Sequence, residues 1–191
     1  MASERNKLTC VTVLMAFFFF NSPTTFAAKP ARMVPTEPYK AVTEFCNKRS
    51  TSEDREFCIK VLKSHPNSTS AKDNPSLLII AVDLGIQNLT TTEVYMANLS
   101  KNKATNATLV LVLKECIPCY PASIGQLRFI PADMAADPPL ASYDALMASD
   151  ALISCDNSFN TRKIADGPVL SRHKIAKAYV QLCVDISMTI H

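Results

Sequence analysis

The chain has 191 residues, of which 48% are hydrophobic and 19% charged, and its formal net charge is +3. A charge so close to neutral is not the signature of a nucleic-acid-binding protein, and the length suits about one ordinary domain. Only three glycines occur and no Asn-Gly or Asp-Gly pair marks a hairpin turn, so the composition argues against an all-β fold.

Residues 1–27 have the pattern of a secretory signal peptide. Arg5 and Lys7 precede an apolar run, and small residues occupy the −3 and −1 positions of a cut after Ala27. The run is shorter than the ~20 residues that a spanning helix needs, and we expect no later stretch to be long and apolar enough to span. The mature domain, residues 28–191, is therefore expected to be soluble and extracellular, with a net charge of +2.

Six cysteines remain after the signal peptide, and in an extracellular chain they predict disulfide bonds, for which 15 full pairings exist. Four Asn-x-Ser/Thr sequons without a central proline predict N-glycosylation, and they fit a product of the secretory pathway. The four candidate sites are Asn67, Asn88, Asn98 and Asn106, of which Asn88 falls inside a predicted helix.

The first half of the mature chain predicts three helices. Two short ones cover about 36–46 and 51–63, the second with Thr51 as its cap and an acidic residue three positions later. A long helix over 74–101 opens with Asn74 as a cap and Pro75 at its first position. Its core-facing row is Val82, Ile86, Leu89 and Met96.

The second half predicts three further helices. The region 103–136 contains a β-branched run that suits a strand, but its flanking lysine, alanine and glutamine residues favour a helix. A helix over 140–159 begins at Asp-Pro-Pro, and a last one covers about 168–190. The core-facing row of the last helix is Ile175, Tyr179, Leu182, Cys183, Ile186 and Ile190.

Cys116 and Cys119 form a Cys-x-x-Cys pair, which is typical of a redox dithiol or of half a zinc site. A thioredoxin-like fold needs strands and turn glycines that the chain lacks. A zinc site needs two more ligands, and no second Cys-x-x-Cys or His-x-x-x-His supplies them. Neither chemistry is therefore favoured.

No other catalytic, metal or cofactor site is predicted. The three histidines, His65, His173 and His191, are expected to be exposed. The carboxylates Glu93, Asp133, Asp144 and Asp150 are scattered over helical positions and are expected to be solvated.

The order of the cysteines and their neighbours resembles the plant invertase and pectin methylesterase inhibitor family from about Glu37 to the C-terminus. The landmarks are "CNKRSTSEDREFCIKVLKSHP", the helix after "NPSLL", "LKECIPCYPASIGQL" and "ALMASDALISCDNSF". In the third, Cys116, Tyr120, Ser123, Ile124 and Leu127 match a family pattern, and in the fourth Phe159 follows Cys155 by four residues.

The resemblance implies an all-α fold, an up-and-down four-helix bundle (about 75–190) behind an N-terminal helical hairpin (about 36–64). It implies disulfides Cys46–Cys58 and Cys116–Cys155. Cys183 occupies a place where many members have a lone cysteine, and Cys119 is additional to the family pattern. Both are candidate free thiols.

The resemblance also implies a secreted, non-catalytic inhibitor of the plant cell wall that blocks a carbohydrate-active enzyme. Pectin methylesterase is the first expectation for the target, and acid invertase is the alternative. Bundle helices two and three and their connection form much of the family's contact surface. Invertase-directed members often have a Pro-Lys-Phe turn in that connection, and here the matching residues are Pro138, Pro139 and Leu140, without the basic residue.

Two further alternatives concern the same fold. The bundle occurs as the pro-region of pectin methylesterases, but the sequence ends at His191, directly after the last predicted helix, so this function is not expected. A secreted interaction protein without inhibitory activity remains open because Pro118 and Pro121 interrupt the second bundle helix. An interior proline removes a hydrogen bond and clashes with the preceding turn, and we predict a kink or break near 117–121.

Overall fold

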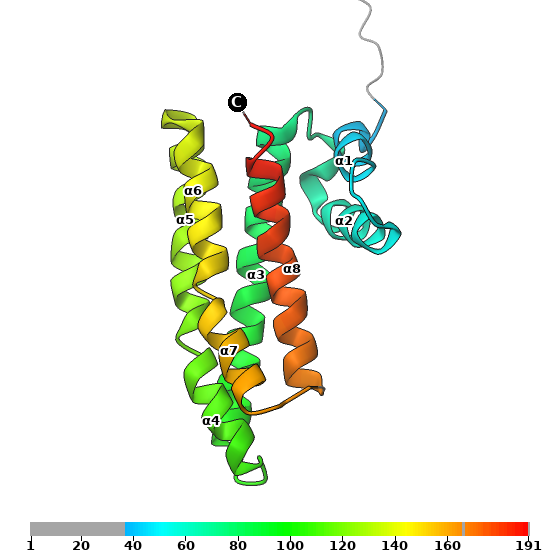
Figure 1. The fold of residues 1–191 in the computed structure, drawn as a ribbon. Coiled ribbons are helices and arrows are strands. Elements are labelled where there is room, and N and C mark those ends of the chain that lie inside the picture. Colours follow the sequence, from blue (N-terminus) through cyan, green and yellow to red (C-terminus); the bar gives the residue numbers. More distant parts are fainter. Residues whose placement is uncertain (1–36, 166, 191) are drawn as a thin grey trace, which may run out of the picture. The chain divides into compact units, whose positions relative to one another are not determined.

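The computed structural model describes residues 37–165 and 167–190, so the predicted signal peptide and His191 lie outside the described residues. The described residues form eight α-helices and one 3₁₀-helix and contain no β-strand (Figure 1). The all-α prediction is confirmed.

The first two helices form a short hairpin closed by a disulfide. Helix α1 (Lys40–Cys46) and α2 (Ser52–Ser64) are joined by the Cys46–Cys58 bond, the pairing that the family resemblance implies. The Thr51 hydroxyl accepts a hydrogen bond from the Asp54 amide at 3.0 Å and caps α2 as predicted. A 3₁₀-helix, η1 (Pro66–Thr69), follows and leads to the bundle.

Helix α3 (Asn74–Lys101) covers the predicted range, but its cap differs from the prediction. Asp73, not Asn74, is the cap, because its carboxylate accepts the Ser76 amide at 2.9 Å and the Ser76 hydroxyl accepts the Asp73 amide at 3.2 Å. Of the predicted core row, Val82, Leu89 and Met96 are buried and Ile86 is half-buried.

The second bundle helix is broken, as predicted. Helix α4 (Ala107–Cys116) ends before Ile117, and α5 (Cys119–Ala136) begins after Pro118. Pro118 has no amide hydrogen for the carbonyl of Lys114, so the α-helical ladder stops there. Pro121 contributes less, because it lies in the first turn of α5, where amide hydrogens have no partner within the helix.

The third bundle helix is also broken, which the sequence did not predict. Helix α6 (Pro138–Asp150) and α7 (Ile153–Thr161) are separated by Ala151 and Leu152. The Ser123 hydroxyl of α5 donates to the carbonyl of Ala148 at 2.8 Å, close to this break. The Cys116–Cys155 disulfide joins α4 to α7 and so links the segments beyond the two breaks.

Helix α8 (Pro168–Ser187) is the last bundle helix, and its core-facing row differs in part from the prediction. Leu182, Cys183 and Ile186 are buried, but Ile175 is 46% exposed. The buried stripe is wider than one row because α8 packs against both α3 and α6. Tyr179 is half-buried and stacks edge-on against Phe57 of the hairpin, with ring centroids 5.5 Å apart.

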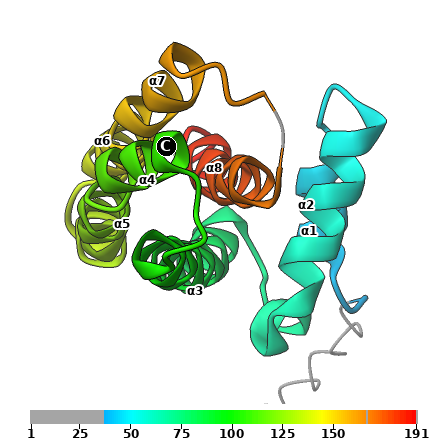
Figure 2. The same ribbon diagram turned by 90° about the horizontal axis from the view of Figure 1, so that it is seen from below.

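If each broken helix is counted as one, four helices surround the core. Helix α3 packs on α5 and α8, and α6 packs on α5 and α8 (Figures 1 and 2). The core is filled mainly by aliphatic side chains with Tyr120 and Phe159 among its largest members. The ion pair between Arg49 and Asp185 fastens the hairpin to α8.

Two helical stretches, Asn74–Lys101 and Ala107–Ala136, are long and apolar enough to cross a membrane. Judged by length and composition alone, the expectation that no such stretch follows the signal peptide is therefore wrong. This is weak support for a membrane segment, because the core helices of a bundle meet the same criteria, and the buried share of these two is 44% and 39%.

Candidate protein-binding surface

Large apolar side chains stand exposed on the outer face of the hairpin formed by α5 and α6. Phe129 of α5 and Tyr143 of α6 are each 58% exposed. Leu140 and Leu146 of α6 are 46% and 40% exposed. We call the face carrying these four residues the α5–α6 face.

The helical register places these side chains at one level of the hairpin. The carboxyl groups of Asp133 on α5 and Asp144 on α6 lie close enough across the seam between the helices for Asp133 to raise the pKa of Asp144. Phe129 lies one turn from Asp133, and Tyr143 is the neighbour of Asp144 in sequence. Because residues four apart in a helix share a face, Phe129 lies on the Asp133 side of α5, and Tyr143 lies at the level of Asp144 on the exposed side of α6.

The surroundings of Phe129 on α5 are small. Ala122, Gly125, Ala132 and Ala136 recur on the Phe129 side of the helix, at helical spacing. A Cβ atom added at Gly125 would meet nothing within 4 Å. Because its neighbours are small, the phenyl ring protrudes from the surface of α5, a shape suited to insertion into a pocket of a partner.

The α5–α6 face is acidic, although the chain as a whole is slightly basic. Between Cys119 and Asp150 there are four aspartates, of which Asp137 and Asp150 are exposed, and one arginine, Arg128. Asp144 is not solvated as expected: it is buried, and its Oδ2 has no hydrogen-bond partner among the described residues. Burial, and then the carboxyl group of Asp133, raises the pKa of Asp144 to about 6.

The residues Pro138, Pro139 and Leu140 do not form a separate turn. They are the first turn of α6, and the whole connection from α5 is Asp137. Proline is favoured at the first helical position, because its missing amide hydrogen would have no partner there. Leu140 points to solvent and belongs to the α5–α6 face, whereas Pro138 is half-buried.

The predicted glycosylation sites lie away from this face. Asn67, Asn98 and Asn106 are exposed, and Asn88 is half-buried with an unpartnered Oδ1 atom. They occupy η1, α3 and the start of α4, and no sequon falls in α5 or α6. The four sequons therefore lie outside the two helices that form this face.

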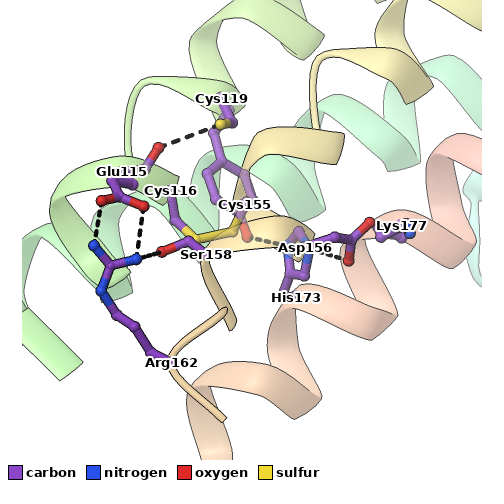
Figure 3. The surroundings of a disulfide bond; sticks show 10 residues. Glu115, Cys116, Cys119, Cys155, Asp156, Ser158, Arg162, His173 and Lys177 are labelled. Atoms are coloured by element: carbon purple, nitrogen blue, oxygen red, sulfur yellow. Dashed lines mark hydrogen bonds and ion pairs between the residues drawn. A yellow bond between two sulfur atoms is a disulfide. The ribbon is translucent and has the colours of Figure 1, made fainter. Parts of the chain in front are cut away.

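The expectation of an exposed His173 is wrong. Its side chain is fully buried, and its Nδ1 lies 2.9 Å from the Tyr120 hydroxyl. Its Nε2 lies 3.0 Å from Asp156 Oδ1 (Figure 3). Burial lowers the pKa of His173, and Asp156 opposes that change in part. The neutral ring donates from Nε2 to Asp156 and accepts at Nδ1 from Tyr120, which satisfies both nitrogens.

The His173 network ties three helices together. Tyr120, Asp156 and His173 belong to α5, α7 and α8, and Lys177 completes the network through an ion pair with Asp156. Tyr120 and His173 are fully buried, whereas Asp156 and Lys177 are partly exposed, and the links among three helices fit a structural role. His65 is half-buried and contacts Asp83 at 3.1 Å.

No group of three or more candidate metal ligands occurs in residues 37–165 and 167–190. Cys119 and Cys183 are buried and outside the two disulfides. Cys116 is bonded to Cys155, so Cys116 and Cys119 are not a free dithiol.

Comparison with known proteins identifies the family of the chain. Residues 40–188 match the model of the plant invertase/pectin methylesterase inhibitor family. The chain belongs to this family. Family membership makes it a non-catalytic protein with a protein target, an invertase or a pectin methylesterase.

Two relatives of the inhibitor have names that refer to invertase-type enzymes. An Arabidopsis thaliana protein named "Cell wall / vacuolar inhibitor of fructosidase 2" is 32% identical over 66% of this chain and 70% of its own. A Platanus acerifolia protein, whose name refers to an invertase inhibitor, is 27% identical over 92% of this chain and 93% of its own.

A solved structure supports the fold of the inhibitor. A mutant form of an Arabidopsis pectin methylesterase inhibitor superposes with a TM-score of 0.64, at 18% identity, over 78% of this chain and 97% of its own. Sequence reasoning missed Phe129 and Tyr143 as surface residues, because large aromatic residues are usually buried. The row of small residues around Phe129 was the available signal.

Proposed function

We propose that this chain is a secreted inhibitor that inserts the α5–α6 face into the active-site cleft of a cell-wall carbohydrate-active enzyme. The observation that supports this function is the exposure of Phe129 and Tyr143 on the α5–α6 hairpin, whose two helices contain no sequon. Exposed aromatic side chains are the residues that most often anchor protein interfaces. Binding a preformed surface also costs less conformational entropy than ordering a loop.

Pectin methylesterase is the proposed target. Its substrate class, pectin, is an acidic polymer, so a cleft that attracts it also attracts the acidic α5–α6 face. The absence of a basic residue at Pro138–Leu140 agrees with this choice.

Acid invertase is the second candidate, and the names of the relatives favour it. The Arabidopsis relative at 32% identity is named for inhibition of a fructosidase of the cell wall or vacuole. The same name supports a cell-wall or vacuolar destination for this chain.

The test is a titration of purified residues 28–191 into a plant pectin methylesterase and into an acid invertase at mildly acidic pH. Saturable loss of esterase activity alone supports the first target, and loss of sucrose cleavage alone supports the second. No effect on several isoforms of either enzyme contradicts the proposed function.

Variants locate the contact surface on the inhibitor. Phe129→Ala should weaken inhibition by about 10- to 100-fold, the usual loss for an aromatic anchor. Ile175→Ala is the matched control, since Ile175 is an exposed apolar residue of α8 outside the α5–α6 face. Gly125→Arg adds bulk to the face at a position where the fold has open space. Equal inhibition by all three variants would place the contact elsewhere.

A further inference from the structure

Cys119 follows the disulfide-bonded Cys116 by three residues, and its side chain lies in the neighbourhood of the Cys116–Cys155 bond (Figure 3). Its Sγ donates to the main-chain oxygen of Glu115, the residue before Cys116, at 3.4 Å. Burial raises the pKa of the Cys119 thiol, and the main chain of Cys155 offsets part of that rise. The thiol is thus in reach of the chain segments that carry both bonded sulfurs.

The two candidate partners of Cys155 stand on opposite sides of the helix break. Cys116 is the last residue of α4, and Cys119 is the first residue of α5. Residues three apart on a helical path share a face, and both side chains are buried toward α7. A tether from Cys155 to Cys119 would therefore fasten α7 to α5 in place of α4.

We propose that Cys119 is an alternative partner of Cys155 that is reached by thiol–disulfide exchange. The Cys119 thiolate attacks Sγ of Cys155, and the Cys119–Cys155 bond forms as the Cys116–Cys155 bond breaks. Cys116 leaves as a thiolate and takes up the proton that Cys119 lost. One sulfur–sulfur bond replaces another, so the step needs no oxidant or reductant.

The Cys116–Cys155 bond persists at acidic pH, because exchange is slow there. The attacking species is the thiolate, and its fraction falls about tenfold for each pH unit below the thiol pKa. Two ion pairs hold the neighbouring segments together: Glu115 with Arg162, and Asp156 with Lys177. Exchange is therefore slow in a mildly acidic medium and accelerates in an alkaline one. This inference does not rest on the proposed function.

Disulfide mapping of the native wild-type chain is the first test. The protein is incubated at pH 5 and at pH 8.5 without added thiol, quenched in acid, alkylated and digested with trypsin. Cys116 and Cys119 fall in one tryptic peptide, residues 115–128, so fragment ions between Ile117 and Pro118 must decide which of them is alkylated. We expect Cys116–Cys155 at pH 5 and growing Cys119–Cys155 at pH 8.5. If Cys116–Cys155 is the sole pairing of Cys155 at both pH values, the proposal is wrong.

A variant series gives a second readout that does not depend on exchange rates. In Cys116→Ser, Cys119 should bond to Cys155, so mass analysis should show a single free cysteine, Cys183, in residues 28–191. The double variant Cys116→Ser/Cys119→Ser should keep Cys155 free and melt at a lower temperature. Cys116→Ser/Cys183→Ser is the matched control and should keep the new bond. If Cys116→Ser folds with Cys119 and Cys155 both free, the proposal is wrong. If this variant fails to fold, the wild-type mapping decides.

Discussion

Asp144 is a buried carboxyl group at the contact between α5 and α6. It occupies the inner side of α6, where it is buried against α5, and there it meets a second carboxyl group, Asp133. Two carboxylates in contact cannot both ionise without repulsion, so one proton shared between them is the favourable state. A proton held between these two carboxyl groups would link the two helices that carry Phe129 and Tyr143.

The pH dependence of stability tests this role. The pKa of Asp144 is about 6 in the folded protein, above the 3.8 of an ordinary aspartate. A raised pKa means that the folded state binds the proton more tightly, so the stabilisation is complete below pH 3.8 and is lost as the pH rises through about 6. We expect the wild-type free energy of unfolding to fall between pH 4 and pH 7 by more than that of Asp144→Asn.

Chemical denaturation at several pH values measures this difference. Asp150→Asn is the matched control, because Asp150 lies on the same helix but is exposed. Asp150→Asn should retain the wild-type pH profile. Parallel profiles for wild type and Asp144→Asn would show that no proton is shared.

At the scale of the helix, Gly85 and Gly125, the two glycines within the described bundle helices, differ in the space around them. Gly125 faces open space on α5. At Gly85 of α3, an added Cβ would lie 3.3 Å from Leu127 Cδ1 and 3.7 Å from Cys183 Sγ. Gly85 therefore permits close packing of α3 on α5 and α8, whereas Gly125 has no packing role in the folded chain.

Alanine substitution should separate these cases. Gly125→Ala should raise the free energy of unfolding by about 0.5–1 kcal/mol, because alanine restricts the unfolded chain and favours the helix. Gly85→Ala should give a smaller gain or a loss, because Leu127 must shift to admit the methyl group. Thermal or urea unfolding of both variants measures the effect. A larger gain at Gly85 would contradict the packing inferred here.

Helix boundaries show what sequence patterns can and cannot predict. The break after Cys116 was predictable, because Pro118 removes a hydrogen bond that the helix needs. The break at Ala151–Leu152 carries no proline or glycine and follows from tertiary packing, so no local signal announces it. Asp144 and His173 were misplaced for a related reason: polar side chains are usually exposed, and the groups that they meet come from other helices.

The candidate surface was predictable only in outline. The family resemblance pointed to bundle helices two and three, and the exposed face does lie on α5 and α6. The sequence could not show which rows of those helices face out, because both helices have apolar residues on their inner and outer sides. Leu140 is exposed while the next residue, Ala141, is buried, a distinction that depends on how α6 packs against α5 and α8.

For the whole molecule, the two disulfides act on different loops. Cys46–Cys58 closes a loop of 12 residues in sequence separation within the hairpin, and Cys116–Cys155 closes one of 39 within the bundle. In the chain-entropy model, loops of these sizes stabilise by about 3 and 4 kcal/mol. The hairpin is also held to the bundle by Arg49 with Asp185 and by Phe57 with Tyr179.

Loss of the hairpin disulfide should therefore be felt by the whole domain. If hairpin and bundle unfold together, Cys46→Ser/Cys58→Ser should lower the free energy of unfolding by about 3 kcal/mol. Without the cross-link, the unfolded chain gains conformational entropy, which favours unfolding. Urea unfolding followed by helix content and by tyrosine fluorescence measures the loss. Because Tyr39 lies in the hairpin and Tyr120 in the bundle core, coincident transitions indicate one cooperative unit. An unchanged bundle transition, preceded by early melting of the hairpin, would instead show that the two fold independently.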